Sequence, residues 1–335
     1  MTINRRFLLV RRPVGTPVAE DFKLDPQPIP TLDEGQFLIR NHYASLDPAI
    51  RGWLDDAPSY MPPVRLGDPV RASTIGVVAE SRNDDFPVGQ WVMGLNGIEE
   101  FSVASAGGFT QPIDPAAVPT VTNYLSLFGA VGQTAYFGFL EVCEPKAGDT
   151  VLVTGAAGAV GSLVGQIAKI KGCRVVGIAG GEAKGRWLTE ELGFDAAVDY
   201  KSPEFKRQLR AAVPDGIDVY FDNTGGAVFE ACLFAMKNFG RIACCGALSQ
   251  YDGAPPPHGP RGIPGLIVTK RLNLRGFVVM DFADQNEKAL ADLQGWVADG
   301  RLKVQEDIID GLENLPAALI GLLAGENRGK RMVRV

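Results

Sequence analysis

The chain has 335 residues, of which 46% are hydrophobic and 21% charged, values typical of a globular protein with two domains. Its 33 basic and 39 acidic residues give a formal net charge of −6, which argues against a basic surface for nucleic acid. No apolar run approaches the roughly 20 residues of a membrane span, and the run after Arg6 is too short for a signal peptide. We therefore expect a cytoplasmic protein with neither nucleic-acid nor membrane partners.

The first part of the chain, residues 1–125, is rich in proline, glycine and short runs typical of strands. Strands are expected over residues 7–10, 36–40, 75–79 and 90–93. Asp47 precedes Pro48 and is predicted to form a turn or a helix N-cap rather than to be catalytic. His42 lies in a strand-like segment and is predicted to be structural. The region is expected to be β-rich.

From about Tyr124 onward, strands alternate with helical patterns, as in a doubly wound parallel sheet of the α/β class. The expected strands cover residues 151–154, 174–178, 196–198, 217–221, 241–245 and 272–279. Helices are expected from Glu182, Pro203 and Gly226, the last capped by Asp222. The tail adds a strand after residue 302, a helix over 312–323 and a strand over 331–335. Whether it rejoins the first domain is left open.

The stretch Val151–Gly161 (VLVTGAAGAVG) predicts a pyrophosphate site. A short apolar strand leads into three spaced glycines and then into an amphipathic helix. The backbone N–H groups and the dipole of such a helix attract an anion. In the fingerprint G-x-G-x-x-G, Ala156 takes the first position, Gly158 the approach to phosphate and Gly161 the close helix–strand contact. Plain glycine turns are common, but this context favours dinucleotide binding.

The end of the next strand favours NADP over NAD. Gly180 and Gly181 stand where NAD-preferring folds usually place a carboxylate, and Lys184 and Arg186 follow. Two alternatives stay open: Glu182 facing a ribose hydroxyl, and Lys184 as a solvated charge, although a helix N-terminus disfavours cations.

The five cysteines and two histidines form no metal-ligand pattern. There is no C-x-x-C pair, and a catalytic zinc usually takes three protein ligands. We therefore expect no metal site. Cys244 and Cys245 lie in an apolar run and are predicted to be small core residues of a strand.

Seven segments in their order along the chain resemble the zinc-independent medium-chain reductases, the group of leukotriene B4 12-hydroxydehydrogenase, prostaglandin reductase and alkenal double-bond reductase. They are Asn41–Arg51 (NHYASLDPAIR), Met61–Gly67 (MPPVRLG), Thr134–Gly138 (TAYFG), Ala156–Ser162 (AAGAVGS), Tyr220–Gly226 (YFDNTGG), Gly240–Tyr251 (GRIACCGALSQY) and Gly325–Lys330 (GENRGK). Their joint order is specific for the family and much less so for the substrate.

The resemblance implies a split architecture. A β-rich, GroES-like catalytic domain, residues 1–125 rejoined by 300–335, would surround a Rossmann domain of residues 126–299. NADPH would be the cofactor and a small hydrophobic enone or enal the substrate. A homodimer is also expected, with residues 273–280 as an edge strand that pairs with its twin.

The resemblance also implies the site residues. The cofactor would contact Thr134, Gly158, Ala159, Val160, Gly161, Lys184, Tyr200, Asn223, Cys245, Gly246, Ala247, Leu248, Ser249, Phe277, Val278, Val279 and Asn327. Tyr60 and Tyr251 would face the substrate, although Tyr60 fits an ordinary loop aromatic nearly as well. The proline-rich segment 254–264, which contains His258, would lie over the substrate channel, and its composition equally suits a stiff surface loop.

Hydride addition to the β-carbon of an enone leaves an enolate, which needs a hydrogen-bond donor and a proton. Tyr251 follows a strand at the edge where such sheets bind ligands, and a tyrosine hydroxyl suits both tasks. A half-buried loop tyrosine, with water or a ribose hydroxyl as the proton donor, is the open alternative. The sequence thus predicts an NADPH-dependent reductase of enone C=C bonds. The rivals are an NADPH:quinone oxidoreductase, a non-catalytic NADP(H)-binding sensor and, least favoured, a zinc alcohol dehydrogenase.

Overall fold

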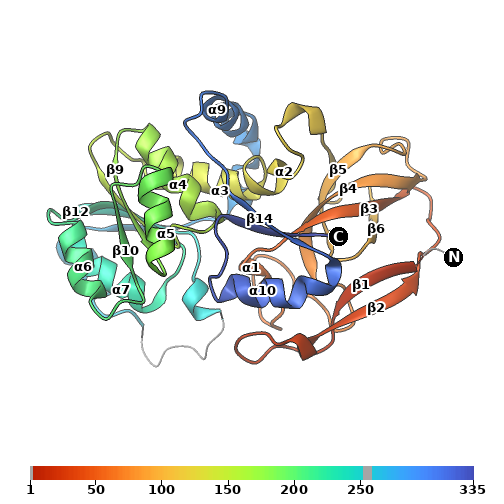
Figure 1. Cartoon of the computed structure of the whole chain (residues 1–335), viewed down its shortest axis with the longest axis horizontal. Coiled ribbons are helices and arrows are strands. Elements are labelled where there is room, and N and C mark those ends of the chain that lie inside the picture. The colour runs from red at the N-terminus through yellow and green to blue at the C-terminus, as the bar shows by residue number, and fades with distance from the viewer. Residues whose placement is uncertain (1–2, 252–258) are drawn as a thin grey trace. The chain divides into compact units, whose positions relative to one another are not determined.

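The computed structural model describes residues 3–251 and 259–335, which divide into two compact units (Figure 1). Unit 1 comprises Met1–Leu125, Glu306–Glu326 and Lys330–Val335, and unit 2 comprises Ser126–Gln305 and Asn327–Gly329. Residues 300–305 and 327–329, which the sequence analysis assigned to the first domain, group with unit 2. The glycine-rich motif and the segments expected to contact the cofactor therefore lie in unit 2, with Tyr60 in unit 1.

Unit 1 is β-rich, as its composition predicts. Its seven-stranded sheet has the order β14-β15-β3-β4-β5-β7, with β6 also paired to β3, and β1 and β2 form a separate ribbon. The strands are β1 (Ile3–Leu9), β2 (Phe22–Pro28), β3 (Gln36–Ser45), β4 (Arg71–Ser81), β5 (Trp91–Gly97), β6 (Phe101–Ser105), β7 (Gln111–Pro112), β14 (Glu306–Asp310) and β15 (Lys330–Arg334). The helices are α1 (Ala49–Trp53), α2 (Asn123–Ser126), which continues into unit 2, and α10 (Leu315–Leu323).

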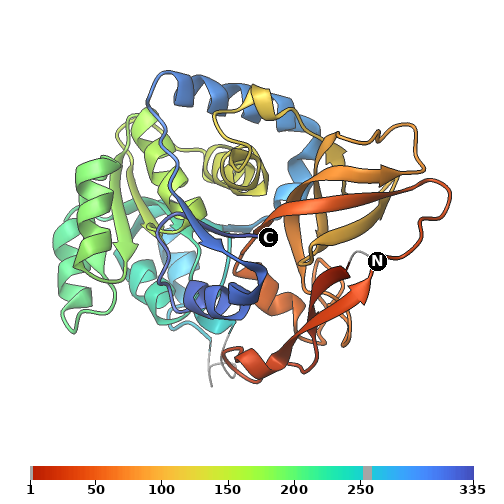
Figure 2. The ribbon, with the colours of Figure 1, turned by 45° about the vertical axis from the view of Figure 1, so that its right-hand side comes forward.

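The core of unit 1 explains why the tail returns to the N-terminal strands. Phe37 and Ile39 of β3 belong to one buried cluster, in which Phe37 stacks on Phe86 with ring centroids 4.1 Å apart. Met332 of β15 is fully buried in a second cluster with Ile75 of β4. β15 pairs antiparallel with β3, so the C-terminal strand lies beside β3 in Figure 2.

Unit 2 contains a six-stranded parallel sheet of order β10-β9-β8-β11-β12-β13. The strands are β8 (Thr150–Thr154), β9 (Arg174–Ala179), β10 (Ala196–Asp199), β11 (Ile217–Asp222), β12 (Met236–Cys244) and β13 (Asn273–Gly276). The helices are α3 (Ala130–Phe137), α4 (Ala159–Ile170), α5 (Glu182–Arg186), α6 (Phe205–Ala212), α7 (Gly226–Ala235), α8 (Gly265–Lys270) and α9 (Asn286–Ala298). The strand order reverses beside β8, which makes the carboxyl ends of β8 and β11 the switch point where such sheets bind ligands. The expected α/β class is confirmed.

The strand predicted over residues 272–279 is wrong in its second half. β13 ends at Gly276 because β12, the strand with which it pairs, ends at Cys244, which pairs with Gly276. Phe277 then leaves the sheet and packs edge-on against Phe221 and Phe282. The candidate edge strand over 273–280 is therefore only four residues long.

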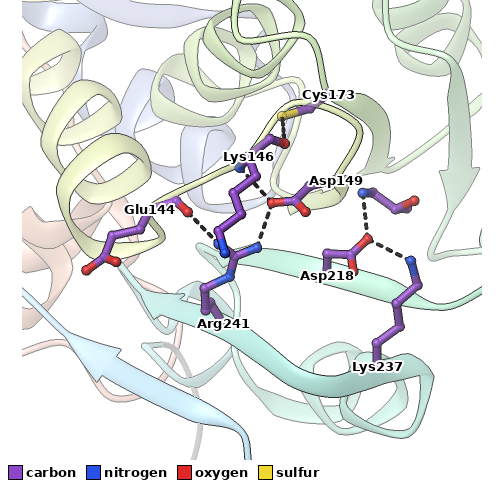
Figure 3. A network of polar contacts seen from close by, with 8 residues as sticks. Glu144, Lys146, Asp149, Cys173, Asp218, Lys237 and Arg241 are labelled. Carbon is purple, nitrogen blue, oxygen red and sulfur yellow. Dashed lines mark hydrogen bonds and ion pairs between the residues drawn. The ribbon is translucent and has the colours of Figure 1, made fainter.

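Ion pairs tie together the amino-terminal side of this sheet (Figure 3). Arg241 of β12 donates to the Asp149 carboxylate at 2.6 Å and to the carbonyl of Glu144. The same Asp149 oxygen accepts from the backbone N–H of Lys146 at 2.7 Å. Alongside, Asp218 accepts from Thr150 N and from Lys237 Nζ. These contacts lie away from the carboxyl ends of the strands and fix the connection that leads into β8.

Candidate active site

The glycine turn after β8 leaves backbone donors available for an anion. Gly155 has a left-handed backbone (φ 58°), and Gly158 is the N-cap of α4, with no side chain capping the helix. A Cβ on Gly161 would lie 2.3 Å from the carbonyl oxygen of Gly155, so only glycine permits this close packing of α4 on the turn. The first N–H groups of α4 lack intrahelical acceptors, as at any helix start, and its first turn holds no acidic residue.

The left-handed residue of the turn lies one residue before the first position of the fingerprint. It is Gly155, and Ala156 occupies that first position. Ala156 is fully buried, and its N–H donates to the carbonyl of Ile178 in β9. The glycine spacing is thus G-x-x-G-x-x-G, with Gly155 supplying the conformation that an L-residue rarely adopts.

The tail segment Asn327–Gly329 lies directly on the glycine turn. Gly329 N donates to the carbonyl of Ala157 at 2.9 Å, and Gly158 and Gly329 form a parallel bridge. The side chain of buried Asn327 donates to the carbonyl of Gly329 at 2.8 Å. This segment therefore closes one side of the expected pyrophosphate site, although it is distant from the turn in sequence.

Cationic and aromatic side chains gather at the carboxyl ends of β9 and β10. Lys184 is half-buried in α5, which begins after Gly180 and Gly181, and Tyr200 follows β10. A Cβ on Gly180 would lie about 3 Å from side-chain carbons of both Tyr200 and Lys201, so these two residues pack over the glycine. Sequence reasoning missed Lys201, whose Nζ lies 5.8 Å from the centroid of the Tyr200 ring.

The open alternative for Glu182 finds no support in this geometry. Glu182 accepts from Arg186 at 2.9 Å in an exposed i,i+4 pair on α5. The residues present therefore fit a dinucleotide that carries an extra phosphate on its adenosine ribose: an uncapped helix N-terminus for the pyrophosphate, and Lys184 beside a glycine pair for the additional anion.

Asn223 and the loop Cys245–Tyr251 lie at the switch point. The Asn223 side chain donates to the carbonyl of Thr154 at 2.7 Å, which ties it to the end of β8. The N–H groups of Cys245 and Gly246 donate to the carbonyl of Asp222 at 2.8 and 3.2 Å. The loop that contains the expected cofactor contacts is thus bound to the end of β11.

Two sequence expectations about this region need correction. Cys245 is not a core strand residue: β12 ends at Cys244, and both cysteines are half-buried, because the sheet edge opens there. Burial nevertheless raises the pKa of the Cys244 thiol to about 11 and that of Cys245 to about 12, so neither is a thiolate at neutral pH. Asp222 does not cap α7, whose N-cap is Gly225; its carboxylate accepts from the N–H groups of Thr224 and Gly225 instead.

Tyr251 is half-buried and its hydroxyl turns back over its own loop. The hydroxyl oxygen accepts from the N–H of Ala247 at 3.3 Å, and burial raises the pKa of the phenol above its ordinary value. The hydroxyl proton is therefore retained and can be donated to a developing oxyanion. His258 and the first half of the proline-rich segment lie outside the described residues.

Phe277 and Thr134 are linked through a glycine. A Cβ on Gly138 would lie 2.2 Å from the Phe277 ring, so this ring packs on the backbone at the end of α3. Thr134 is half-buried on α3, and its carbonyl accepts from the N–H of Gly138 one turn later. Val278 and Val279 follow Phe277 directly and are half-buried. The two expected cofactor segments thus lie close together within unit 2.

In unit 1, Tyr60 follows α1 and is 55% exposed. Of the two roles expected for Asp47, the turn is observed, because its carbonyl accepts from Ile50 N at 3.0 Å. The N-cap is not: α1 has Pro48 as its N-cap, and no side chain caps it. Asp47 accepts instead from the fully buried Lys330 at 2.6 Å, a partner 283 residues away. His42 stacks at an angle against Trp91, and burial lowers the pKa of its imidazole, which suits the structural role expected for it.

Among residues 3–251 and 259–335, no three His, Cys, Asp or Glu side chains gather as a metal would require. No helix formed by these residues is long and apolar enough to span a membrane.

Comparisons with known proteins agree over the full length. Residues 5–112 match the family model of the N-terminal domain of oxidoreductase, and residues 159–294 match that of zinc-binding dehydrogenase. NADPH-dependent curcumin reductase of Escherichia coli is 42% identical, over 99% of this chain and 97% of the relative. Prostaglandin reductase 1 of Bos taurus is 40% identical over the whole of both chains. The crystal structure of CurA from Vibrio vulnificus in complex with NADPH superposes with a TM-score of 0.94 at 40% identity, over 99% of each chain.

Proposed function

Because the chain belongs to the zinc-independent medium-chain reductases, we propose that it reduces the C=C bond of α,β-unsaturated aldehydes and ketones with NADPH. When bound, the cofactor supplies the hydride that the β-carbon of the substrate accepts. The observation that carries the proposal is the position of Tyr251, a retained hydroxyl donor in a loop bound to the same sheet edge as the glycine turn. The names of the related enzymes support the choice of an enone as substrate.

In this proposal unit 2 is the nucleotide-binding domain and unit 1 the catalytic domain. The N–H groups of Ala159, Val160 and Gly161, beside Gly158, hold the pyrophosphate. Lys184 and Tyr200 hold the 2′-phosphate. The remaining cofactor contacts come from Thr134, Asn223, Cys245, Gly246, Ala247, Leu248, Ser249, Phe277, Val278, Val279 and Asn327.

Tyr251 is the proposed catalytic residue. Its hydroxyl donates to the carbonyl oxygen of the substrate, stabilises the enolate and helps to deliver the proton that completes the reduction. Tyr60 is the second substrate contact, proposed from its place in the family pattern. No side chain in this scheme holds a metal ion.

The test mixes purified protein with NADPH and a panel of enals, enones and quinones, and follows the absorbance of the reduced cofactor. We expect enone-dependent oxidation of NADPH, and a product that has gained two hydrogens across the C=C bond by mass spectrometry. Hydroquinone formation without enone reduction would instead indicate a quinone reductase. Tight NADPH binding with no turnover of any substrate would indicate a sensor.

We also propose that the protein is a cytoplasmic homodimer. β13 is an edge strand of the parallel sheet, and unpaired edges favour pairing with a second copy. The exposed Phe239 lies beside the start of this strand, stacked with Arg271 at 4.6 Å.

A further inference from the structure

The carboxylate of Asp222 is the centre of a buried hydrogen-bond network at the switch point. It is 2% exposed, and its Oδ1 accepts from the hydroxyls of Thr154 and Tyr220, both at 2.7 Å. The N–H groups of Thr224 and Gly225 donate to the same carboxylate at 3.2 and 3.0 Å. Hydrogen bonds to a charged acceptor are the strong ones, so residues 223–225 are folded tightly around this carboxylate.

Thr154 links this carboxylate to Asn223. Its hydroxyl donates to Asp222 and accepts from the backbone N–H of Asn223 at 2.9 Å. Its carbonyl accepts from the Asn223 side chain at 2.7 Å. Asn223 is therefore held by both its backbone and its amide against the last residue of β8, directly before the glycine turn.

Backbone carbonyls of residues 223 and 224 also hold the loop that contains the catalytic tyrosine. The carbonyl of Asn223 accepts from Leu248 N at 3.2 Å. The carbonyl of Thr224 accepts from Ser249 N at 2.9 Å and from the Ser249 hydroxyl at 2.7 Å. Tyr251 follows two residues later. One continuous chain of contacts thus leads from the buried carboxylate to the tyrosine.

We propose that Thr154 and Asp222 are positioning residues, which set Asn223 and the Cys245–Tyr251 loop in the geometry that hydride transfer requires. This inference rests on the proposed function. The two side chains are buried behind the loop and act through it, so their loss misplaces the reacting groups and leaves the pyrophosphate donors of α4 in place. A small misplacement of this kind lowers turnover more than binding.

Two hydroxyls on the same carboxylate oxygen provide a matched pair of variants. Thr154→Val removes the hydroxyl that bridges Asp222 and Asn223 N at nearly constant volume. Tyr220→Phe removes an equally short hydrogen bond to Asp222 and the contact of the Tyr220 hydroxyl with Thr154, but it leaves the hydrogen bond from Asn223 N to the Thr154 hydroxyl in place. Both variants lose one hydrogen bond to Asp222, and only Thr154→Val also loses the hydrogen bond from Asn223 N, which is the link under test. Thr154→Ser, which keeps the hydroxyl, serves as the rescue.

The first measurement is amide hydrogen exchange over residues 246–251 in protein without cofactor. We expect Thr154→Val to exchange about 10-fold faster than wild type there, with Tyr220→Phe within about 2-fold. The second is steady-state kinetics with an enone: kcat is expected to fall about 10-fold in Thr154→Val, with the Kd of NADPH within about 3-fold, and to recover in Thr154→Ser. Equal effects of Thr154→Val and Tyr220→Phe, or no effect of Thr154→Val, would overturn the inference.

The proposed function and the positioning role of Thr154 are contradicted by different results. A wild-type protein that turns over no enone contradicts the proposed function, and the exchange experiment then still decides whether Thr154 holds the loop. If Thr154→Val does not fold, Ser249→Ala replaces it, because Ser249 is exposed and its hydroxyl anchors the loop to Thr224. Faster exchange at residues 246–251 in Ser249→Ala supports the inference, and unchanged exchange overturns it.

Discussion

At the scale of single residues, the Tyr251 phenol is poised as a proton-carrying donor. Burial raises its pKa above the ordinary value near 10. The neutral form is the donor, so a raised pKa extends donation to higher pH. We expect kcat to stay flat from neutral pH up to the ordinary range of a phenol and to fall only above that range, measured as a pH–rate profile with saturating enone.

The comparison for this profile is Tyr251→Phe. Loss of the hydroxyl should lower kcat about 100-fold, the lower range for a positioned acid, and remove the alkaline limb. An alkaline limb that begins below the ordinary pKa of a phenol and disappears in Tyr251→Phe would contradict a raised pKa. An unchanged kcat in this variant would contradict the catalytic role itself.

Lys184 should decide which nicotinamide cofactor binds. A charge-assisted contact to a phosphate contributes about 1.5–3 kcal/mol, so Lys184→Ala should weaken NADPH binding about 10- to 100-fold. NADH lacks the 2′-phosphate, and its Kd should change less than about 2-fold. Fluorescence titration with both cofactors measures this, with exposed Lys206→Ala on α6 as the control for net charge. Equal weakening for both cofactors would show that Lys184 acts elsewhere.

At the scale of elements, the packing of α4 on the glycine turn depends on one missing methyl group. A Cβ on Gly161 would meet three backbone atoms, Gly155 O at 2.3 Å, Ala156 Cα at 2.8 Å and Gly155 C at 2.9 Å, and backbone cannot move aside as a side chain can. Gly161→Ala should therefore displace α4 and lower the free energy of unfolding by about 3 kcal/mol. NADPH binding should be lost with it, because the helix N-terminus moves.

The matched control is Gly295→Ala in α9. Nothing lies within 4 Å of the Cβ that it would add, and its backbone is helical. This substitution should raise stability by about 0.5–1 kcal/mol through helix propensity, with NADPH binding unchanged. Chemical denaturation and cofactor titration of both variants provide the measurement. Two variants of equal stability would contradict the steric argument.

The ion pair between Arg241 and Asp149 should contribute stability without affecting turnover. Both side chains are mostly buried, and Asp149 also accepts from Lys146 N, so Arg241→Ala leaves a carboxylate with one partner fewer. We expect the free energy of unfolding to fall by about 2 kcal/mol, below the range for a fully buried pair. The comparison is Arg301→Ala, which breaks an exposed pair with Asp299 and should cost less than about 0.5 kcal/mol. A large loss of kcat in Arg241→Ala would contradict a purely structural role.

At this scale, the sequence predicts features that depend on residues close together in the chain. The glycine turn and α4 depend on neighbouring residues, so local pattern identified them. The end of β13 depends on where β12 ends. The packing of Tyr200 and Lys201 against Gly180 depends on the neighbouring strand β10, which both residues follow. Neither is visible in a window of ten residues, and both were missed or misplaced.

At the scale of the whole molecule, the interactions that local sequence patterns cannot predict join residues still farther apart in the chain. Within unit 1, Lys330 reaches Asp47 across 283 residues, and within unit 2 Gly329 bonds to Ala157. The apolar run of the tail indicates a buried strand but carries no information about its partner. Only the family resemblance suggested that the tail returns, and the register of β15 on β3 needed the structure.

The homodimer is the prediction that belongs to the whole molecule. Phe239 is 69% exposed and has a left-handed backbone (φ 63°), as has Arg271 (φ 51°), on which it stacks. Such conformations cost of order 1–3 kcal/mol in bulky residues. An exposed aromatic held in this way beside the unpaired edge of β13 is explained if a second copy covers it.

We therefore expect sedimentation equilibrium to give twice the 35.8 kDa chain mass, and Phe239→Glu to shift the equilibrium toward monomer by about 10-fold or more, because a carboxylate would be buried at the interface. Phe109→Glu is the matched control: Phe109 is 65% exposed, lies in unit 1 and should leave the mass unchanged. Since Phe239 lies in the first half of β12, before the carboxyl end of the strand, monomeric Phe239→Glu should still bind NADPH. A monomeric wild type would refute pairing through β13, and a dimer that Phe239→Glu leaves intact would place the interface on another surface.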